Sequence, residues 1–281
     1  MEKEMHYRYL TVLSIAGSDC SGGAGIQADL KTFASLGRYG ASVVTAVTAQ
    51  NTCGVRAIQA IEPRIVREQL EAVLADLTID AVKVGMLHSE ANVHAVAELL
   101  GRYRPRWVVV DPVLLSTSGS RLLEAEAVGC LVEELFPQAD LVTPNLPEAT
   151  YLTHLPVDTE AEAVRAGERL LEMGSRAVLL KGGHRTGPDM VDMLFRPGQQ
   201  PETYTEPRVD TRNTHGTGCT LSSAIACYLA ETQDLSTSVR LAKRYLHDAL
   251  ERGAGIAVGH GHGPVCHDFH PYLIAQEEAK A

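Results

Sequence analysis

Short apolar runs alternate with amphipathic stretches along most of the chain. Runs of strand length, rich in β-branched residues, cover residues 10–17, 41–50, 81–87, 107–113, 140–145 and 176–183. Between them, apolar residues recur at intervals of three and four over residues 26–37, 67–77, 91–103, 123–135 and 162–174, which predicts helices that each bury one face. This alternation predicts a three-layer α/β/α fold, with helices on both faces of a mainly parallel central sheet.

The organisation of the chain predicts a single domain over residues 1–281. The sequence contains no internal repeat and no low-complexity linker. The stretch RPGQQPET, from Arg196, lies between two strand-like segments and predicts a hairpin turn. We expect residues 1–9 and 272–281 to form flexible termini.

Composition narrows the class of protein. The formal charge of -10, without a run of basic residues, disfavours a nucleic-acid partner. No segment approaches the roughly 18 apolar residues of a membrane span, and MEKEMHYRYL at the N-terminus lacks the apolar core of a signal peptide. We therefore expect no membrane partner and a cytoplasmic location. The six cysteines show no CxxC pair, so neither a zinc ribbon nor a disulfide framework is indicated.

The stretch NTHGTGC, residues 213–219, leads directly into the Ala- and Leu-rich segment TLSSAIACYLA, which predicts a helix. The first turn of a helix presents free backbone N–H groups, and glycines allow the chain to approach an anion closely. Gly216, Thr217 and Gly218 therefore form a candidate anion hole, with Cys219 beside it. The alternative is that Gly216 and Gly218 only make a tight turn.

Polar residues follow three of the predicted strands. Asn145 and Glu148 lie three residues apart in PNLPE, where a helix would place both on one side. Glu148 could there hold a hydrated Mg²⁺, through water, near a nucleotide. Lys181 and Asp111 end two other strands, and the ammonium of Lys181 could meet nucleotide phosphates. Each of these residues could instead be a helix cap or a solvated charge, but together they predict phosphoryl transfer from a nucleotide.

These motifs occur in an order that resembles a known family. NTHGTGC is similar to the variant of the ribokinase-superfamily signature in which a cysteine replaces the usual catalytic aspartate. With AGSDCSGGAG, KVGML, TPNLPEA, LLKGGH and VGHGHGPVCHDFH, the chain resembles the hydroxymethylpyrimidine and hydroxymethylpyrimidine phosphate kinases of thiamine biosynthesis from residue 10 to residue 270. The resemblance implies a ribokinase-like fold, a homodimer, and ATP with Mg²⁺. It also implies two successive phosphorylations of 4-amino-5-hydroxymethyl-2-methylpyrimidine.

The same resemblance implies a pocket for the pyrimidine. Gly17 and Asp29 would line it from a glycine-rich loop and helix, while Gln50 and Met86 would approach from two other strand ends. A glutamine amide offers a donor and an acceptor in one plane, which complements an aminopyrimidine edge. The thioether of methionine suits the face of a flat ring. Without the resemblance, Gln50 and Asp29 would be interpreted as ordinary polar ends of a strand and a helix.

The chain departs from the family pattern at two positions. Cys20 stands where the family more often has proline, and Thr117 stands where many members have a lysine in a loop near the phosphates. The second departure could weaken or redirect anion binding, but it leaves the reaction class unchanged.

A cysteine at position 219 suits two different phosphorylation steps. Transfer to an alcohol requires a group that accepts its proton, whereas a phosphate monoester is already largely anionic. A fixed carboxylate would repel the phosphorylated substrate, by on the order of 4 kcal/mol for unit charges 4 Å apart at an effective dielectric of 20. We expect the helix start to lower the pKa of Cys219, making it the base of the first step and largely dispensable for the second. The alternative is a buried cysteine without chemistry.

Three alternatives stay open. His260, His262, Cys266, His267 and His270 crowd into GHGHGPVCHDFH, which suggests either a metal site or a loop that folds over the active site. A pyridoxal or pyridoxine kinase of the same fold would use a similar heteroaromatic alcohol. A non-catalytic pyrimidine-sensing protein would keep the pocket without the chemistry.

Overall fold

The centre of the protein is one nine-stranded sheet, in the order β3-β2-β1-β4-β5-β6-β7-β8-β9. The structure is a computed structural model, and it describes residues 8–116, 119–183 and 187–269. The strands are β1 (Thr11–Asp19), β2 (Tyr39–Asn51), β3 (Gly54–Ala60), β4 (Ala81–Val84), β5 (Val108–Val110), β6 (Leu141–Val142), β7 (Val178–Leu180), β8 (Asp189–Phe195) and β9 (Glu202–Pro207).

The parallel part of the sheet coincides with the six apolar runs of the sequence. Strands β2, β1, β4, β5, β6 and β7 pair in parallel. Antiparallel strands extend both edges, with β3 beside β2 and with the β8–β9 hairpin beside β7. The predicted mainly parallel sheet and the predicted hairpin turn are therefore confirmed, whereas β3 was not predicted.

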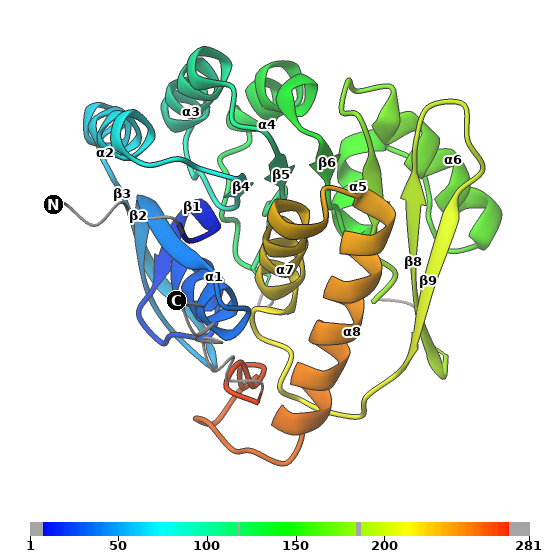
Figure 1. Ribbon diagram of the computed structural model, residues 1–281. Helices are drawn as coiled ribbons and strands as arrows, with labels where there is room; N and C mark the ends of the chain where they lie inside the picture. Colours follow the sequence, from blue (N-terminus) through cyan, green and yellow to red (C-terminus); the bar gives the residue numbers. More distant parts are fainter. Residues whose placement is uncertain (1–7, 117–118, 184–186, 270–281) are drawn as a thin grey trace, which may run out of the picture.

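Helices cover both faces of the sheet (Figure 1). One face carries α1 (Gly25–Ser35), α7 (Thr217–Thr232) and α8 (Leu235–Gly253). The other carries α2 (Pro63–Asp76), α3 (Glu90–Tyr103), α4 (Ala127–Cys130), α5 (Leu146–Thr153) and α6 (Glu160–Leu171). A π-helical turn, Leu131–Leu135, and a 3₁₀ turn, Phe136–Gln138, continue α4. The helix expected from residue 123 begins later because the Glu124 amide bonds to the His88 carbonyl, 2.9 Å away.

Two apolar cores separate these layers. Val12 and Leu13 are neighbours on β1, yet Val12 belongs to the core under α7 and Leu13 to the core under α3. Successive side chains of a strand point to opposite faces, so the central strands are mainly apolar on both faces, with buried polar exceptions such as Ser14 and Lys83. This burial explains why they appear in the sequence as almost continuous apolar runs.

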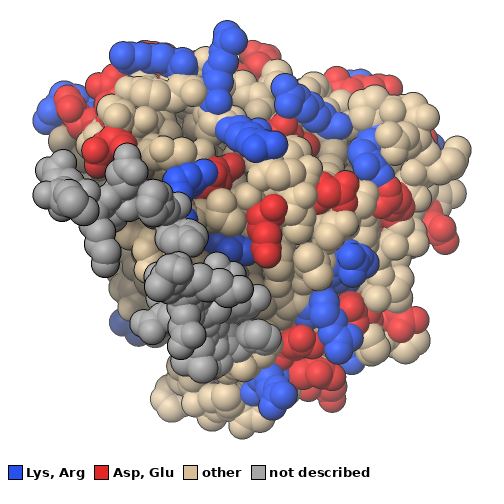
Figure 2. Space-filling model, viewed as in Figure 1, with Lys and Arg blue, Asp and Glu red and all other residues tan. Residues whose placement is uncertain are grey.

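The order of the strands creates a crevice beside β1. The chain leaves β1 toward β2 on one side and later returns to β4 on the other side. In such sheets, ligands bind beyond the carboxyl ends of the strands at this point of reversal. On the face seen in Figure 2, lysine and arginine side chains intermingle with aspartate and glutamate. Within the described ranges, no helix has the length and apolar content needed to cross a membrane.

Candidate active site

A cavity of about 590 Å³ occupies this crevice. The start of α7, the ends of several parallel strands, the β8–β9 hairpin and α8 all contribute to its wall. Eleven of the twelve site residues expected from the sequence line the cavity: Gly17, Gln50, Met86, Asp111, Asn145, Glu148, Lys181, Gly216, Thr217, Gly218 and Cys219. The exception is Asp29.

The first turn of α7 has the properties expected of an anion hole. Gly216 has φ of 82°, and a Cβ there would lie 1.9 Å from the Gly23 carbonyl oxygen, so only glycine fits. A Cβ on Gly218 would come within 3.3 Å of the Lys181 ammonium and 3.4 Å of a carboxylate oxygen of Asp111. No side chain of the described residues caps this helix end. The Thr217 amide donates to the Thr214 carbonyl over 3.3 Å, which leaves the next amides, those of Gly218 and Cys219, as the candidates for binding an anion.

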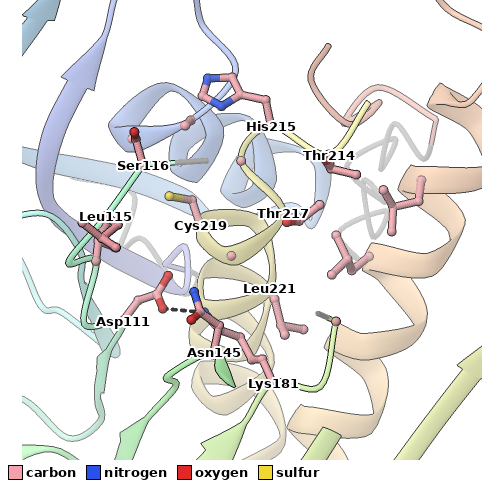
Figure 3. A pocket seen from close by; sticks show the side chains of 18 of the residues that line it. Asp111, Leu115, Ser116, Asn145, Lys181, Thr214, His215, Thr217, Cys219 and Leu221 are labelled. Carbon is pink, nitrogen blue, oxygen red and sulfur yellow. Dashed lines mark hydrogen bonds and ion pairs between the residues drawn. The ribbon is translucent and has the colours of Figure 1, made fainter. Parts of the chain in front are cut away.

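Asp111 and Lys181 lie together beside this turn (Figure 3). The Lys181 ammonium donates a hydrogen bond to Asp111 over 2.7 Å, and the Thr143 hydroxyl donates to the same carboxylate over 3.0 Å. Burial opposes the charge of Lys181, but Asp111 and Glu148 outweigh burial and raise the pKa of Lys181. A fixed cation therefore faces the start of α7.

Asn145 and Glu148 cap α5 as well as lining the cavity. The Asn145 side chain accepts from the Glu148 amide over 2.9 Å, and the Glu148 carboxylate accepts from the Asn145 amide over 2.8 Å. Asn145 and Glu148 therefore do form a helix cap, as the alternative interpretation of the sequence proposed, and they line the cavity as well. Burial raises the pKa of Glu148 to about 7, with Lys181 opposing the shift and Asp111 adding to it. A cation next to this carboxyl would relieve the cost of its buried charge.

Gln50 lies at the other end of the cavity. The register between β2 and β3 shifts between Ala49 and Gln50, and such a bulge redirects the side chain that follows it. The backbone amide of Gln50 donates to the Cys20 sulfur over 3.4 Å. Among the described residues, no group bonds to the side-chain amide of Gln50, so that side chain is available to a ligand. The Cys20 thiol, at the first departure from the family pattern, lies 3.1 Å from the Gln50 carbonyl oxygen and donates to it.

Met86 and Gly17 adjoin Gln50 in the cavity wall. Met86 packs against Ala46 and Leu122 in a small apolar cluster. A Cβ on Gly17 would lie 3.0 Å from the Met86 sulfur, so glycine leaves room for the thioether. This end of the cavity therefore combines an apolar surface with one unsatisfied amide.

Asp29 does not line the cavity, and the expectation that it does is wrong. Its carboxylate is fully buried and accepts from the Lys83 ammonium over 2.8 and 2.9 Å. The hydroxyls of Ser14 and Ser223 donate to it over 2.5 and 2.7 Å. Asp29 therefore pairs with Lys83, a residue that the sequence analysis did not identify as part of the site. Burial opposes the charge of Lys83, but Asp29, together with Cys219 and Asp111, outweighs burial and raises the pKa of Lys83.

Cys219 lies in the first turn of α7 and lines the cavity. Burial raises the pKa of its thiol, while Lys83 opposes that shift and Asp29 and Asp111 add to it. The expected lowering of this pKa is therefore wrong, because burial outweighs the favourable position at a helix start. With its pKa above the ordinary value of 9.0, the thiol is protonated at neutral pH.

Asp19 and His215 were also missed in the sequence, and they join two loops of the site. His215 Nε2 lies 2.8 Å from an Asp19 oxygen, and the amides of Gly23 and Ala24 donate to the same carboxylate. Burial alone would raise the pKa of Asp19, but these bonds and those from Ser21 lower it. Asp19 thus stays charged and holds the glycine-rich loop against the loop before α7.

The histidines near the C-terminus are spread apart. His267 is buried and shares a hydrogen bond of 3.0 Å with the Thr220 hydroxyl, and burial lowers its pKa to about 4. The amides of His260 and His262 donate to Thr52, beside the β2–β3 turn. Over the part of the chain that the structure describes, these histidines form no group of three adjacent metal-ligand atoms. His270 and Thr117 lie outside the described residues.

The fold and the site together define a ribokinase-like phosphotransferase. The sequence profile of the family described as phosphomethylpyrimidine kinase matches residues 19–266, and the chain belongs to this family. The chain is 50% identical over 259 residues to the hydroxymethylpyrimidine/phosphomethylpyrimidine kinase of Rhizobium meliloti (strain 1021), covering 92% of this chain and 96% of the relative. It is also 50% identical over 270 residues to the thiamine biosynthesis bifunctional protein ThiED of Geobacter sulfurreducens, of which it spans 54%.

Solved structures show the same architecture. The phosphomethylpyrimidine kinase of Clostridium difficile 630 matches with a TM-score of 0.76 and 44% identity, over 86% of this chain and 99% of that chain. The pyridoxal kinase from Staphylococcus aureus, in complex with AMP-PCP and pyridoxal, matches with a TM-score of 0.86 and 29% identity, over 95% of this chain and 96% of that one. The predicted family and fold class are confirmed.

Proposed function

We propose that the protein transfers phosphate from ATP to 4-amino-5-hydroxymethyl-2-methylpyrimidine and then to the resulting monophosphate. One observation carries the proposal: the uncapped start of α7 opens into the same cavity as the unsatisfied amide of Gln50. The first feature fits a transferring phosphoryl group, and the second fits the edge of an aminopyrimidine. A single cavity thus offers places for both partners of the reaction.

The nucleotide end would hold the phosphates of ATP. The amides of Gly218 and Cys219 would donate to the transferring phosphoryl group, and Lys181 would neutralise part of its charge. Leu221, Leu246 and Leu250 line the same end of the cavity and would contact the nucleoside. Positioning and charge stabilisation of this kind account for most of the catalysis in phosphoryl transfer.

The donor atoms of this end also fit Mg²⁺. Glu148, through water, and Asp111 would hold the ion, because both carboxylates line the cavity and Mg²⁺ prefers oxygen ligands. The raised pKa of Glu148 indicates a carboxyl group that lacks sufficient positive charge around it. When bound, Mg²⁺ would neutralise the charge of the nucleotide phosphates.

At the other end, Gln50 would recognise the amino group and ring nitrogen of the pyrimidine, and Met86 would contact the ring face. Gly17 leaves the room that this contact requires. Asp29 takes part only indirectly, because its ion pair fixes Lys83 in the cavity wall. This assignment changes the role that the family resemblance implied for Asp29.

Cys219 would serve the two steps differently. As a neutral thiol it does not repel the phosphorylated substrate of the second step. To act as the base of the first step it must first lose its proton, which burial opposes and Lys83 favours. The rate of the first step should therefore still increase with pH near the ordinary thiol pKa of 9.0, while the second step should not depend on this group.

A pyridoxal or pyridoxine kinase is the nearest alternative, since a pyridoxal kinase shares the fold. Gln50 favours the aminopyrimidine, because the pyridoxine ring does not offer an amino group beside its ring nitrogen. Competitive kinetics with ATP and both alcohols test the choice. We expect a higher kcat/KM for the hydroxymethylpyrimidine, and a higher value for pyridoxine would reverse the assignment. A lack of ATP consumption with either alcohol would instead favour a non-catalytic sensor.

Three further expectations remain predictions from the sequence: a single domain, a homodimer and a cytoplasmic location. Light scattering coupled to size-exclusion chromatography tests the dimer. A mass of one chain, about 30.3 kDa, would contradict it.

A further inference from the structure

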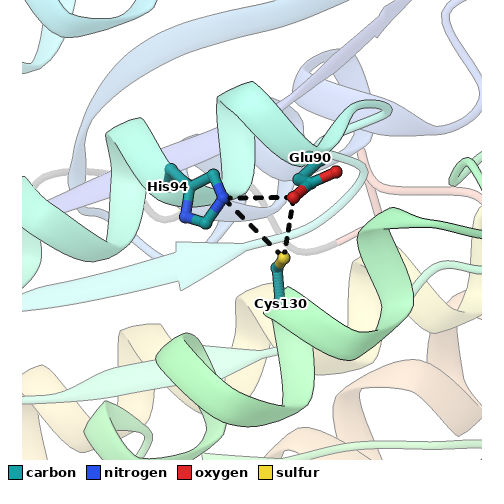
Figure 4. Close-up of side chains that lie close together, drawn as sticks. All are labelled: Glu90, His94 and Cys130. Atoms are coloured by element: carbon teal, nitrogen blue, oxygen red, sulfur yellow. Dashed lines mark hydrogen bonds and ion pairs between the residues drawn. The ribbon is translucent and has the colours of Figure 1, made fainter.

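Three side chains with metal-binding atoms meet on the surface between α3 and α4. Glu90 and His94 lie one turn apart on α3, and Cys130 ends α4 (Figure 4). The Glu90 carboxylate lies 3.4 Å from His94 Nε2 and 3.4 Å from the Cys130 sulfur. The sulfur lies 3.8 Å from His94 Nε2. Among the described residues, no other group of three His, Cys, Asp or Glu side chains has its ligand atoms this close together.

These separations fit a tetrahedral zinc site. Zinc bonds of about 2.3 Å to sulfur and about 2.0 Å to nitrogen or oxygen place pairs of ligand atoms roughly 3.3 to 3.5 Å apart. The three observed separations, 3.4, 3.4 and 3.8 Å, therefore require only small adjustments of the side chains. Thiolate, imidazole and carboxylate together also form a ligand set that zinc uses.

A fourth side chain holds the imidazole in the orientation that metal binding requires. His94 Nδ1 lies 2.7 Å from a carboxylate oxygen of Glu134, which follows Cys130 by four residues. When Nδ1–H donates to this carboxylate, the lone pair of Nε2 faces Glu90 and Cys130. A carboxylate in this position is the usual outer partner of a metal-bound histidine, and it makes the imidazole more basic.

Charge and exposure also favour a bound cation. The ion pairs recorded for the carboxylates of Glu90 and Glu134 are both with His94, so two carboxylates share one imidazole. The His94, Glu90 and Glu134 side chains are 44%, 50% and 37% exposed. An ion can therefore enter from solvent, and a water molecule can occupy the fourth position.

We propose that Glu90, His94 and Cys130 bind one Zn²⁺, or a similar transition-metal dication, with Glu134 as the outer partner of His94. On binding, the Cys130 thiol loses its proton to solvent and the sulfur coordinates the ion as a thiolate. The site is separate from the active site, because none of these side chains lines the cavity. It would join α3 to α4, and α4 directly follows the loop that contains Leu115 and Leu122 of the cavity wall.

Cobalt(II) provides a direct probe, because a cobalt–thiolate bond gives a charge-transfer absorption band in the near ultraviolet. Protein prepared without a histidine tag is stripped of metal and titrated with Co²⁺. We expect one equivalent to produce the band and Zn²⁺ to abolish it. The band should be lost in Cys130→Ser and in His94→Gln. It should persist in the matched controls Cys53→Ser and His262→Gln, which change an exposed cysteine and an exposed histidine elsewhere.

Glu134→Gln tests the outer partner. Loss of such a carboxylate weakens metal binding by about 10- to 100-fold, so this variant should keep the band at a higher Co²⁺ concentration. Absence of the band in the parent protein, or an unchanged band in Cys130→Ser, would overturn the proposal. Equal loss of the band in the control variants would overturn it as well.

A second measurement uses only the parent protein and does not depend on the folding of any variant. Alkylation by iodoacetamide is followed at each cysteine by peptide mass spectrometry, with and without Zn²⁺. We expect Zn²⁺ to slow alkylation of Cys130 at least tenfold and to leave the exposed Cys53 unchanged. Equal alkylation rates of Cys130 in the two conditions would show that its contacts are only hydrogen bonds.

Discussion

Replacing Glu148 with glutamine should stabilise the protein at alkaline pH while impairing catalysis. The carboxyl group is buried, and its pKa is about 7 instead of the ordinary 4.5. Glutamine keeps a side-chain oxygen that can accept from the Asn145 amide, so the cap of α5 is largely retained. The substitution therefore mainly removes a charge that the fold accommodates poorly.

The expected magnitude follows from the difference in pKa. Between about pH 4.5 and pH 7 the folded state binds this proton more tightly than the unfolded state, so the stability of the parent decreases as the pH rises. A shift of this size corresponds to at most about 3 kcal/mol, reached once the pH exceeds 7. The Glu148→Gln variant has no carboxyl group at this position, so its folding stability does not decrease for this reason as the pH rises. Its stability relative to the parent should increase by up to about 3 kcal/mol across that window.

Urea denaturation of both proteins at pH 5 and pH 8, with EDTA present, measures the effect. Glu162→Gln is a matched control, because Glu162 occupies the same capping position in α6 but is exposed, and its bonds to Thr159 lower its pKa. The control should gain no stability at pH 8. A Glu148→Gln curve parallel to that of the parent at both pH values would refute the reasoning. Kinase activity of Glu148→Gln should decrease through weaker use of Mg²⁺.

Three other substitutions test separate parts of the site. Cys219→Ala should slow phosphorylation of the alcohol by about 10²- to 10⁴-fold and should change phosphorylation of the monophosphate much less. Each step is assayed alone, and equal losses in both steps would contradict the role of Cys219 as the base. Gln50→Ala should lower kcat/KM for the hydroxymethylpyrimidine by about 10- to 100-fold through one or two lost hydrogen bonds, and an equal loss with pyridoxine would remove Gln50 as the specificity residue. Lys83→Met should destabilise the fold by about 3 to 5 kcal/mol in urea denaturation, because it leaves the buried charge of Asp29 unpaired. Adding Asp29→Asn should restore part of that loss, and no restoration would show that the ion pair is not the cause.

The fold was predictable where burial on both sides of the sheet determines the sequence. Each central parallel strand is mainly apolar on both faces and is therefore visible as an almost continuous apolar run. The edge strand β3 was missed because it contains only exposed and partly buried residues and therefore no continuous apolar run. Its pairing with β2 also depends on tertiary context. Helix α8 was missed although its buried Val239, Ala242, Tyr245 and Ala249 recur at intervals of three and four.

The site was predictable where the topology alone brings residues together. Residues at the ends of parallel strands, such as Asp111 and Lys181, meet at one edge of the sheet. Asp29 was placed in the pocket by the family resemblance, and the sequence does not show that its side chain instead turns inward to Lys83. Lys83 was detectable as the one charge within the apolar run AVKV, but its partner was not. The pKa of Cys219 depends on burial, which only the structure provides.

The central claim is that the first amides of α7 bind the transferring phosphoryl group opposite the hydroxymethyl group of the pyrimidine. A crystal structure with the hydroxymethylpyrimidine, Mg²⁺ and a non-hydrolysable ATP analogue tests it most directly. We expect the terminal phosphate within hydrogen-bond distance of the Gly218 and Cys219 amides, and the pyrimidine edge on the Gln50 amide. A terminal phosphate bound elsewhere, with these amides bonded to the protein itself, would contradict the account.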